Sequence, residues 1–199
     1  MNRTGCIVAA VVVLLLALVV GGWLSGQYNG LVASRETVNE AWAQVDNVYQ
    51  RRLDLIPNLV ETVKGVANFE RETYTAVAEA RSRAGQMRVN PDDLDDPEVM
   101  RRFEESQGQL TSALSRLFAV AENYPQLKAN QNFLELQSQL EGTENRIAVE
   151  RRRFNEVARE YNTRVSSVPT NIVAGLFGFR PRPYFESSEG ADRAPQVKF

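Results

Sequence analysis

The sequence has no histidine and one cysteine, Cys6, among its 199 residues. Without histidine it lacks the commonest general base, the Ser-His and Cys-His nucleophile pairs, and the Glu-x-x-His sites that bind metals inside helical bundles. A single cysteine forms no disulfide within the chain. We therefore predict no catalytic residue, no cofactor-binding residue and no metal ligand, and we interpret the protein as a non-enzyme without cofactors.

The sequence also lacks an excess of either charge, with 23 Lys and Arg against 25 Asp and Glu. Nucleic-acid-binding proteins carry a basic excess on one face, so we expect no nucleic-acid partner. A carboxylate-metal site is the alternative use of the acidic residues. We disfavour it, because histidine is absent and charged residues are common on exposed helix faces. The glutamates considered are Glu61, Glu79, Glu141 and Glu144.

One segment, Ile7 to Leu24, has no charge at all. Its length is close to the roughly 20 residues that cross about 30 Å of hydrocarbon, and Trp23 and Tyr28 stand where interfacial aromatic residues are expected. A cleaved signal peptide is the alternative, but its apolar region is usually shorter, about 7–15 residues, and no A-x-A site follows. Cys6 precedes the apolar run, which disfavours a lipoprotein. We predict a retained single-pass anchor that contacts the lipid bilayer through Ile7 to Leu24.

The charges that flank this segment bear on its orientation. Arg3 lies on the N-terminal side, whereas Arg35, accompanied by Glu36, is the first basic residue on the other side. The positive-inside tendency favours an inner N-terminus. We therefore expect a cell-membrane protein whose bulk lies on the outer, periplasmic or extracellular, side.

Beyond the anchor, apolar residues recur every three or four positions almost to Ser167, as in helices that bury one face. We predict that the first helix continues the membrane helix and is ended or kinked at Pro57, because the residue before a proline is pushed out of the α region. Asn58 and Glu61 have capping-box spacing, which predicts the start of a second helix there.

Two further helices complete the pattern. Asp96 and Pro97 have the arrangement of an N-cap and a first helical position, which predicts the start of the third helix. Asn123-Tyr124-Pro125 ends it, and the fourth helix is expected from about Gln126 to Val165. The predicted fold is all-α, an N-terminal transmembrane helix continuing into an antiparallel four-helix bundle. The predicted divisions are 1–27 for the anchor, 28–167 for the bundle and 168–199 for the tail.

The tail begins with a short apolar stretch, Thr170 to Phe179, followed by Arg180 and Arg182. An even number of helical passes returns the chain to the membrane end of a bundle. The stretch then either lies at the bilayer surface, with its arginines among the headgroups, or caps the open end of the bundle. The two interpretations are compatible. Beyond Glu186 the composition is polar, and we expect a mobile end.

Four polar residues fall where the helical pattern expects apolar ones: Arg35, Arg52, Thr143 and Glu150. A count of helical rise places Arg35 and Glu150 in the same layer. A buried charge needs a partner, so we predict that these two pair. Such a pair either fixes the register of the bundle or forms part of a polar patch that binds a partner or another copy.

Several specific stretches resemble the LemA family of membrane-anchored bacterial proteins, from the anchor to about Phe185. They are Tyr28-Asn29-x-Leu31-Val32, Ala41-Trp42-Ala43-x-Val45, Arg51-Arg52-x-Asp54-Leu55-Ile56-Pro57-Asn58-Leu59-Val60-Glu61-Thr62-Val63-Lys64-Gly65, Tyr124-Pro125-x-Leu127-Lys128-Ala129-Asn130-x-Asn132-Phe133, Gln139-Leu140-Glu141-x-Thr143-Glu144-Asn145-Arg146-Ile147-Ala148, Asn155, Tyr161-Asn162, Phe177-Gly178-Phe179 and Tyr184-Phe185. The chain departs from the family after Gly65, with Val66 where a tyrosine is commoner and Phe69 where a histidine is commoner.

The resemblance implies an antiparallel four-helix bundle behind a membrane helix, and it supplies no catalytic residue. It implies a scaffold or accessory protein, sometimes linked with membrane proteases. Our main hypothesis is a non-catalytic membrane scaffold that self-associates as a homo-oligomer or holds a partner protein. The alternative is an accessory subunit of a membrane protease or transporter.

Overall fold

The computed structural model describes residues 3–66 and 68–186. All secondary structure within these ranges is helical, which confirms the all-α prediction. The elements are α1 (Arg3–Lys64), α2 (Arg71–Gln86), the 3-10 turn η1 (Pro91–Asp93), α3 (Pro97–Ala121), α4 (Pro125–Lys128), α5 (Gln131–Ser166) and α6 (Thr170–Phe177). The expected mobile end beyond Glu186 lies outside the described residues, and the predicted domain divisions stay predictions.

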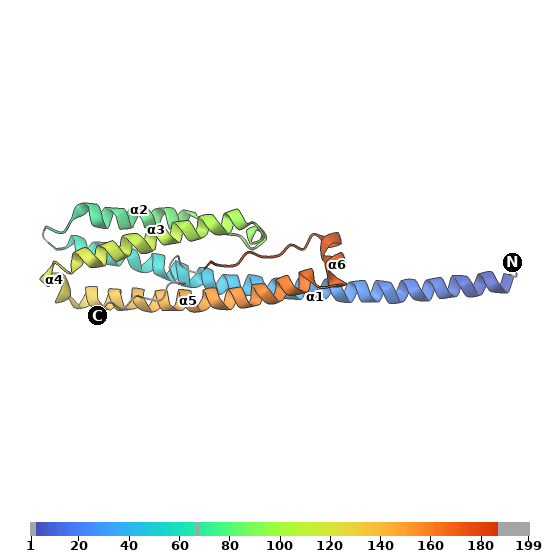
Figure 1. Cartoon of the computed structure of the whole chain (residues 1–199). Helices are drawn as coiled ribbons and strands as arrows, with labels where there is room; N and C mark the ends of the chain where they lie inside the picture. The colour runs from blue at the N-terminus through green and yellow to red at the C-terminus, as the bar shows by residue number, and fades with distance from the viewer. Residues whose placement is uncertain (1–2, 67, 187–199) are drawn as a thin grey trace, which may run out of the picture.

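The long helix α1 organises the molecule (Figure 1). Its N-terminal part projects beyond all other elements, and its C-terminal part packs along α5, which runs in the opposite direction. The helices α2 and α3 form a second antiparallel pair, and this pair packs on α1 mainly through α2. The protein is therefore a rod with two helical pairs at one end.

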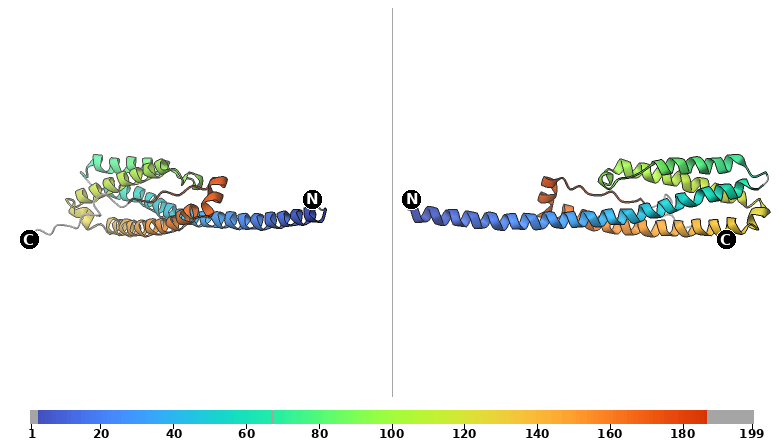
Figure 2. Two further views of the ribbon diagram at one scale, coloured as in Figure 1. Left: turned by 45° about the vertical axis from the view of Figure 1, so that its right-hand side comes forward. Right: turned by 180° about the vertical axis from the view of Figure 1, so that it is seen from behind.

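The first helix does not end at Pro57, so of the two predicted effects of this proline, an end or a kink, the end was wrong. Proline has no amide hydrogen, and Pro57 therefore leaves the carbonyl oxygen of Leu53, four residues earlier, without a helical partner. The Nε of Arg81 on α2 donates a hydrogen bond to this oxygen at 2.9 Å. Because the orphaned carbonyl is satisfied from a neighbouring helix, α1 continues to Lys64. Beyond its middle, α1 rises toward α2 and away from α5 in both views of Figure 2.

The predicted second helix start at Asn58 was wrong for the same reason. The Glu61 carboxylate accepts a hydrogen bond from Lys64 at 2.8 Å inside α1, and α2 begins only at Arg71. The predicted start of the third helix is confirmed, because the Asp96 carboxylate accepts the Glu98 amide at 2.8 Å and Pro97 holds the first position.

The break at Asn123-Tyr124-Pro125 is also confirmed, but α5 begins later than predicted. The single turn α4 follows the break. Asn130 then caps α5 by accepting the amide of Phe133 at 3.1 Å. Gly142 lies within α5 and does not interrupt it.

Two apolar clusters form the interior. The proximal cluster, on the side of the projecting part of α1, includes Trp42, Phe103, Phe154, Tyr161 and Phe185. The distal cluster includes Ile56, Leu59, Leu110, Leu117 and Phe133. On α1, Tyr49 belongs to the first cluster and Leu53 to the second, so Arg52 lies at the boundary between them.

After α5 the chain turns across α1. The helix α6 lies across the α1 axis beside the projecting part of that helix (Figures 1 and 2). Gly178 ends α6 in the left-handed conformation, with φ of 74°, which glycine adopts without steric cost. The following segment, residues 179–186, has no regular secondary structure and runs back toward the helical pairs (Figure 1). We call residues 179–186 the strap.

Candidate functional site

The side chain of Arg52 is the most deeply buried charge in the described chain, with 2% of its surface exposed. One Nη donates hydrogen bonds at 3.0 Å to Thr111 on α3 and at 3.0 Å to Glu144 on α5. The other Nη donates to the side-chain oxygen of Gln107 on α3. A single guanidinium thus joins α1, α3 and α5, and we call Arg52 with these three partners the arginine node.

The arginine node compensates for the burial of its charge. An isolated buried guanidinium costs several kcal/mol of solvation, and an ion pair with further hydrogen bonds offsets this. Glu144 supplies the negative charge while 52% of its own side chain stays exposed to solvent. The guanidinium also lies over the ring of Tyr49, 5.1 Å from its centroid, in a cation-π arrangement. The node therefore holds three helices in register.

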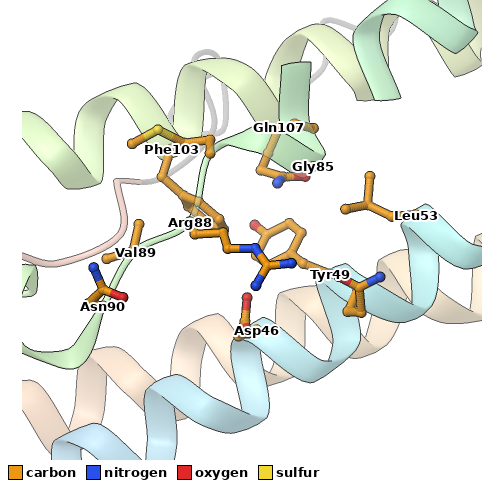
Figure 3. A pocket seen from close by; sticks show the side chains of 12 residues that line it. Asp46, Tyr49, Leu53, Gly85, Arg88, Val89, Asn90, Phe103 and Gln107 are labelled. Carbon is orange, nitrogen blue, oxygen red and sulfur yellow. The ribbon is translucent and has the colours of Figure 1, made fainter. Parts of the chain in front are cut away.

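A polar pocket of about 270 Å³ opens beside the node (Figure 3). It lies between α1, the connection after α2, and α3. Asp46 and Tyr49 come from α1, Arg88 and Asn90 from the connection, and Gln107 from α3. Figure 3 shows the guanidinium of Arg88 extending into the pocket toward Asp46 and Tyr49. Gln107 belongs both to the pocket and to the node, so the two share a wall.

The pocket is suited to binding a polar group. Burial raises the pKa of the Tyr49 hydroxyl, although the charges of Arg151 and Arg52 act in the opposite direction. The hydroxyl is therefore a neutral donor at physiological pH, beside a carboxylate and a guanidinium. This set of groups can recognise a polar or charged side chain of another protein. Its lining residues include no serine, threonine, cysteine or lysine, the common nucleophiles of covalent catalysis.

The four glutamates considered as metal ligands do not come together. Glu144 pairs with Arg52, Glu61 with Lys64, and Glu141 accepts a hydrogen bond from Gln137 at 3.0 Å. Within residues 3–66 and 68–186, no three Cys, Asp or Glu side chains are grouped to hold a metal ion.

Of the polar residues predicted in the helical seam, Arg52 and Thr143 are buried. The predicted pair of Arg35 with Glu150 was wrong. Arg35 lies 4.0 Å from Glu36 and over the ring of Phe179, whereas Glu150 lies 3.9 Å from Arg153.

The register of α1 and α5 explains this error. Arg52 is level with Glu144, and Ser34 is level with Arg164. At 1.5 Å per residue, these two pairs place Glu150 about 17–20 Å along the axis from Arg35. The count of helical rise took Pro57 as the top of the first helix and a residue near Gln126 or Asn130 as the start of the last. In the structure α1 continues to Lys64 and α5 begins at Gln131, and both differences shift the register in the same direction.

Two asparagines on α5 hold the strap, a role that the sequence analysis did not identify. The side chain of Asn162 accepts the amide of Arg182 at 2.7 Å and donates to its carbonyl at 2.8 Å. Asn155 does the same with Phe185, at 2.8 and 2.9 Å. Seven helical residues rise about 10.5 Å, and three extended residues span about 10 Å, so the two spacings match. Both asparagines stood among the stretches that resemble LemA proteins, which was the available signal.

The Phe185 side chain connects the strap to the pocket indirectly, through Trp42. Its ring stacks on Trp42 at 5.9 Å and meets Phe154 edge-on at 5.3 Å. The guanidinium of Arg151 lies 4.7 Å above the same ring. Trp42 in turn donates to the carbonyl of Val89, a pocket residue, at 3.3 Å. The strap, α1 and the pocket connection are thus packed as one unit.

A model of the LemA family matches residues 41–199 of this sequence, well over half of its length. The chain belongs to the LemA family. The match includes the arginine node, the polar pocket and the strap, and it begins within α1, beyond the apolar segment. Together with the N-terminal helix, membership in the LemA family indicates a membrane-associated helical protein.

Curated relatives of this LemA family chain are 24% identical to it over the aligned residues. Protein LemA of Metamycoplasma hominis is 24% identical over 164 residues, covering 82% of this chain and 71% of the relative. Magnetosome protein MamQ of Magnetospirillum gryphiswaldense is 24% identical over 190 residues, covering 86% of this chain and 70% of the relative. Magnetosome protein MamQ 2 of Paramagnetospirillum magneticum is 24% identical over 182 residues, covering 83% and 67%.

Proposed function

We propose that this LemA family protein is a non-catalytic, membrane-anchored scaffold that holds a partner protein or a second copy of itself. The continuity of α1 carries the proposal. This helix of 62 residues includes a stretch that is long and apolar enough to cross a membrane, and none of that stretch is buried within the protein. The same helix then supplies residues to both interior clusters. A continuous helix joins the helical pairs to the anchor without a flexible linker.

The length of α1 sets the reach of the scaffold. From Leu24 to Lys64 the helix rises about 60 Å, so its distal end is held far from the hydrocarbon. A partner bound along the helical pairs is then kept at a fixed height above the bilayer. The polar pocket beside Asp46 and Arg88 is the part of this surface best suited to recognise a charged side chain of the partner. Following the positive-inside tendency, we place the helical pairs on the outer face of the cell membrane.

Affinity purification of the intact chain tests the scaffold role. The tagged protein is extracted from membranes with a mild detergent, sized, and analysed by mass spectrometry, and a second copy with a different tag reports self-association. A photo-crosslinking residue at Arg88 probes the pocket, and one at Glu79, an exposed position on α2, is the matched control.

We expect the chain in the membrane fraction, in particles larger than its monomer, with stronger crosslinking from position 88 than from position 79. A membrane protease or transporter as the crosslinked partner would narrow the role to that of an accessory subunit. A monomer without crosslinks from either position, or a chain found only in the soluble fraction, would overturn the proposal.

A further inference from the structure

The short helix α6 carries an apolar face that no other part of the described chain covers. Outside α1, seven large hydrophobic side chains are exposed in the described residues, and five of them lie between Val168 and Tyr184. Ile172 and Leu176 are 68% and 73% exposed. They are four residues apart and therefore share one face of the helix. A cluster of exposed hydrophobic side chains marks a surface that contacts a membrane or another protein.

We propose that α6 is an interfacial helix, which lies in the headgroup layer of the bilayer that α1 enters. The protein then contacts lipid at two places, through its membrane helix and through the outer face of α6. This inference rests on the membrane anchor of the proposed function.

The height of α6 along α1 is fixed by direct contacts. The hydroxyl of Thr170 donates to the side-chain oxygen of Gln27 at 3.0 Å. The ring of Tyr28 meets Phe177 edge-on at 4.9 Å. Gln27 and Tyr28 follow the end of the apolar segment at Leu24 by only about 4–6 Å of helical rise. A headgroup layer is about 5–7 Å thick on each side of the hydrocarbon, so these contacts place α6 within it.

The two faces of α6 have different partners. Val173 and Ala174 are buried and belong to the proximal cluster. The inner face of α6 therefore closes this end of the helical pairs, which is one of the two roles expected from the sequence. The outer face, with Ile172 and Leu176, has no such partner within residues 3–66 and 68–186. Because α6 lies across α1, it runs along the plane of a bilayer that α1 crosses, as interfacial helices do (Figures 1 and 2).

Basic side chains lie on the bundle side of α6, about 15 Å of helical rise beyond Leu24 and therefore just outside a headgroup layer about 5–7 Å thick. Arg164 donates to Ser34 at 3.0 Å, and its guanidinium fills the space beside Gly30, where a Cβ would overlap it. Arg35 lies over the ring of Phe179, and Arg180 is exposed at the start of the strap. Glu36 lies next to Arg35 and reduces the net positive charge of this group. The arrangement is apolar toward the bilayer and basic behind it, as in helices that lie on anionic lipid.

The test measures the depth of α6 in a bilayer directly. In a Cys6→Ser background, single cysteines replace Ile172, Leu176, Leu134 or Leu16, and each carries a nitroxide label. Leu134 is the matched control, because it is an exposed leucine, 49% accessible, near the distal end of α5. Leu16 reports on the anchor itself. The full chain is reconstituted in vesicles of phosphatidylcholine with about one-quarter phosphatidylglycerol, and relaxation by oxygen and by a water-soluble nickel complex is compared.

We expect the ratio of oxygen to nickel accessibility at positions 172 and 176 to be several-fold higher than at 134, and the ratio at position 16 to be higher still. Circular dichroism and thermal melting confirm that each labelled chain is folded. If positions 172 and 176 are as open to nickel as position 134 while position 16 is in lipid, the inference is overturned and the anchor stands. If position 16 is also open to nickel, the anchor itself is overturned, and α6 has no bilayer to lie on.

Discussion

The Nε of Arg81 lies 2.9 Å from the carbonyl oxygen of Leu53, the oxygen that Pro57 deprives of its helical hydrogen bond. Helix α2 thereby repairs the gap that a proline makes in α1. The continuity of α1, on which the proposed scaffold role depends, is thus a tertiary property. It depends on a side chain 28 residues away along the sequence.

Removal of this donor has a predictable cost. We expect Arg81→Met to lower the free energy of unfolding by about 1–2 kcal/mol, the cost of leaving a half-buried carbonyl without a partner. Methionine keeps the aliphatic part of the side chain, so the loss of packing is small. The measurement is denaturant unfolding of the full chain in detergent micelles, followed by circular dichroism.

A double-mutant cycle with Pro57→Ala isolates the interaction. Alanine at position 57 restores an amide that bonds to the Leu53 oxygen, so Arg81→Met in that background should cost clearly less than in the original chain. Equal costs in the two backgrounds would show that Arg81 stabilises the protein in some other way.

The arginine node gives a second prediction. Glu144→Leu leaves the guanidinium of Arg52 buried with only neutral acceptors, Thr111 and Gln107. Loss of one partner of a fully buried pair costs about 3–5 kcal/mol. We expect about 2 kcal/mol here, because Glu144 is half exposed and water can approach its place. Adding Arg52→Met to Glu144→Leu should recover part of this loss, since it removes the uncompensated charge, and the same unfolding experiment measures both. A double variant that is less stable than Glu144→Leu would mean that the hydrogen bonds of Arg52, and not its charge, dominate.

The sequence predicted features that depend on local chemistry. The helical periodicity, the Asp96 cap and the break before Pro125 each follow from residues within a few positions of one another. The burial of Arg52 and Thr143 followed from the same periodicity. These features need no knowledge of which helices are neighbours.

Features that depend on neighbouring helices could not be predicted in this way. Whether Pro57 ends a helix depends on Arg81, which no local pattern associates with it. The error at Pro57 then passed into the register and placed Glu150 opposite the wrong residue. The asparagines of the strap bind backbone groups, and such bonds leave no periodic signal in the sequence.

A pH dependence follows from Glu104. Its carboxylate accepts hydrogen bonds from Arg151 at 2.9 Å and from the amide of Glu186 at 3.2 Å. Burial nevertheless raises its pKa above the ordinary value of 4.5, because desolvation outweighs both partners. The folded state thus binds the proton more tightly than the unfolded state does. Ionised Glu104 therefore contributes less stability than protonated Glu104, and the difference develops as the pH rises from 4.5 through the folded pKa.

Glu104→Gln removes this titration. We expect the stability of Glu104→Gln relative to the original chain to be greater near about pH 7 than near about pH 4. Glu105→Gln, at the exposed neighbour of Glu104 on α3, provides the control for the chemical change from glutamate to glutamine. The measurement is unfolding at a series of pH values. A relative stability of Glu104→Gln that falls as the pH rises would show that Arg151 and the Glu186 amide lower the pKa more than burial raises it.

The strap gives the last prediction. Asn155 makes two hydrogen bonds to the backbone of Phe185, so Asn155→Ala should let this part of the strap leave the surface more often. The loss of two hydrogen bonds worth about 0.7 kcal/mol each is a change of about tenfold in the population of the released strap. Chymotrypsin cleaves after aromatic residues. Tyr184 and Phe185 are its sites in the part of the strap that Asn155 holds. Cleavage at these sites in the micelle-bound chain should therefore become about tenfold faster.

Asn145 is the matched control, because it is an exposed asparagine on the same helix, away from the strap. Asn145→Ala should leave the rate unchanged. Asn155→Asp should fall between the two, since a carboxylate still accepts the Phe185 amide but cannot donate to its carbonyl. The ring of Phe185 stacks on Trp42, so the fluorescence of this tryptophan should change with the same order of variants. Equal cleavage rates for Asn155→Ala and Asn145→Ala would mean that the Phe185 ring, packed against Trp42 and Phe154, holds the strap without help from Asn155.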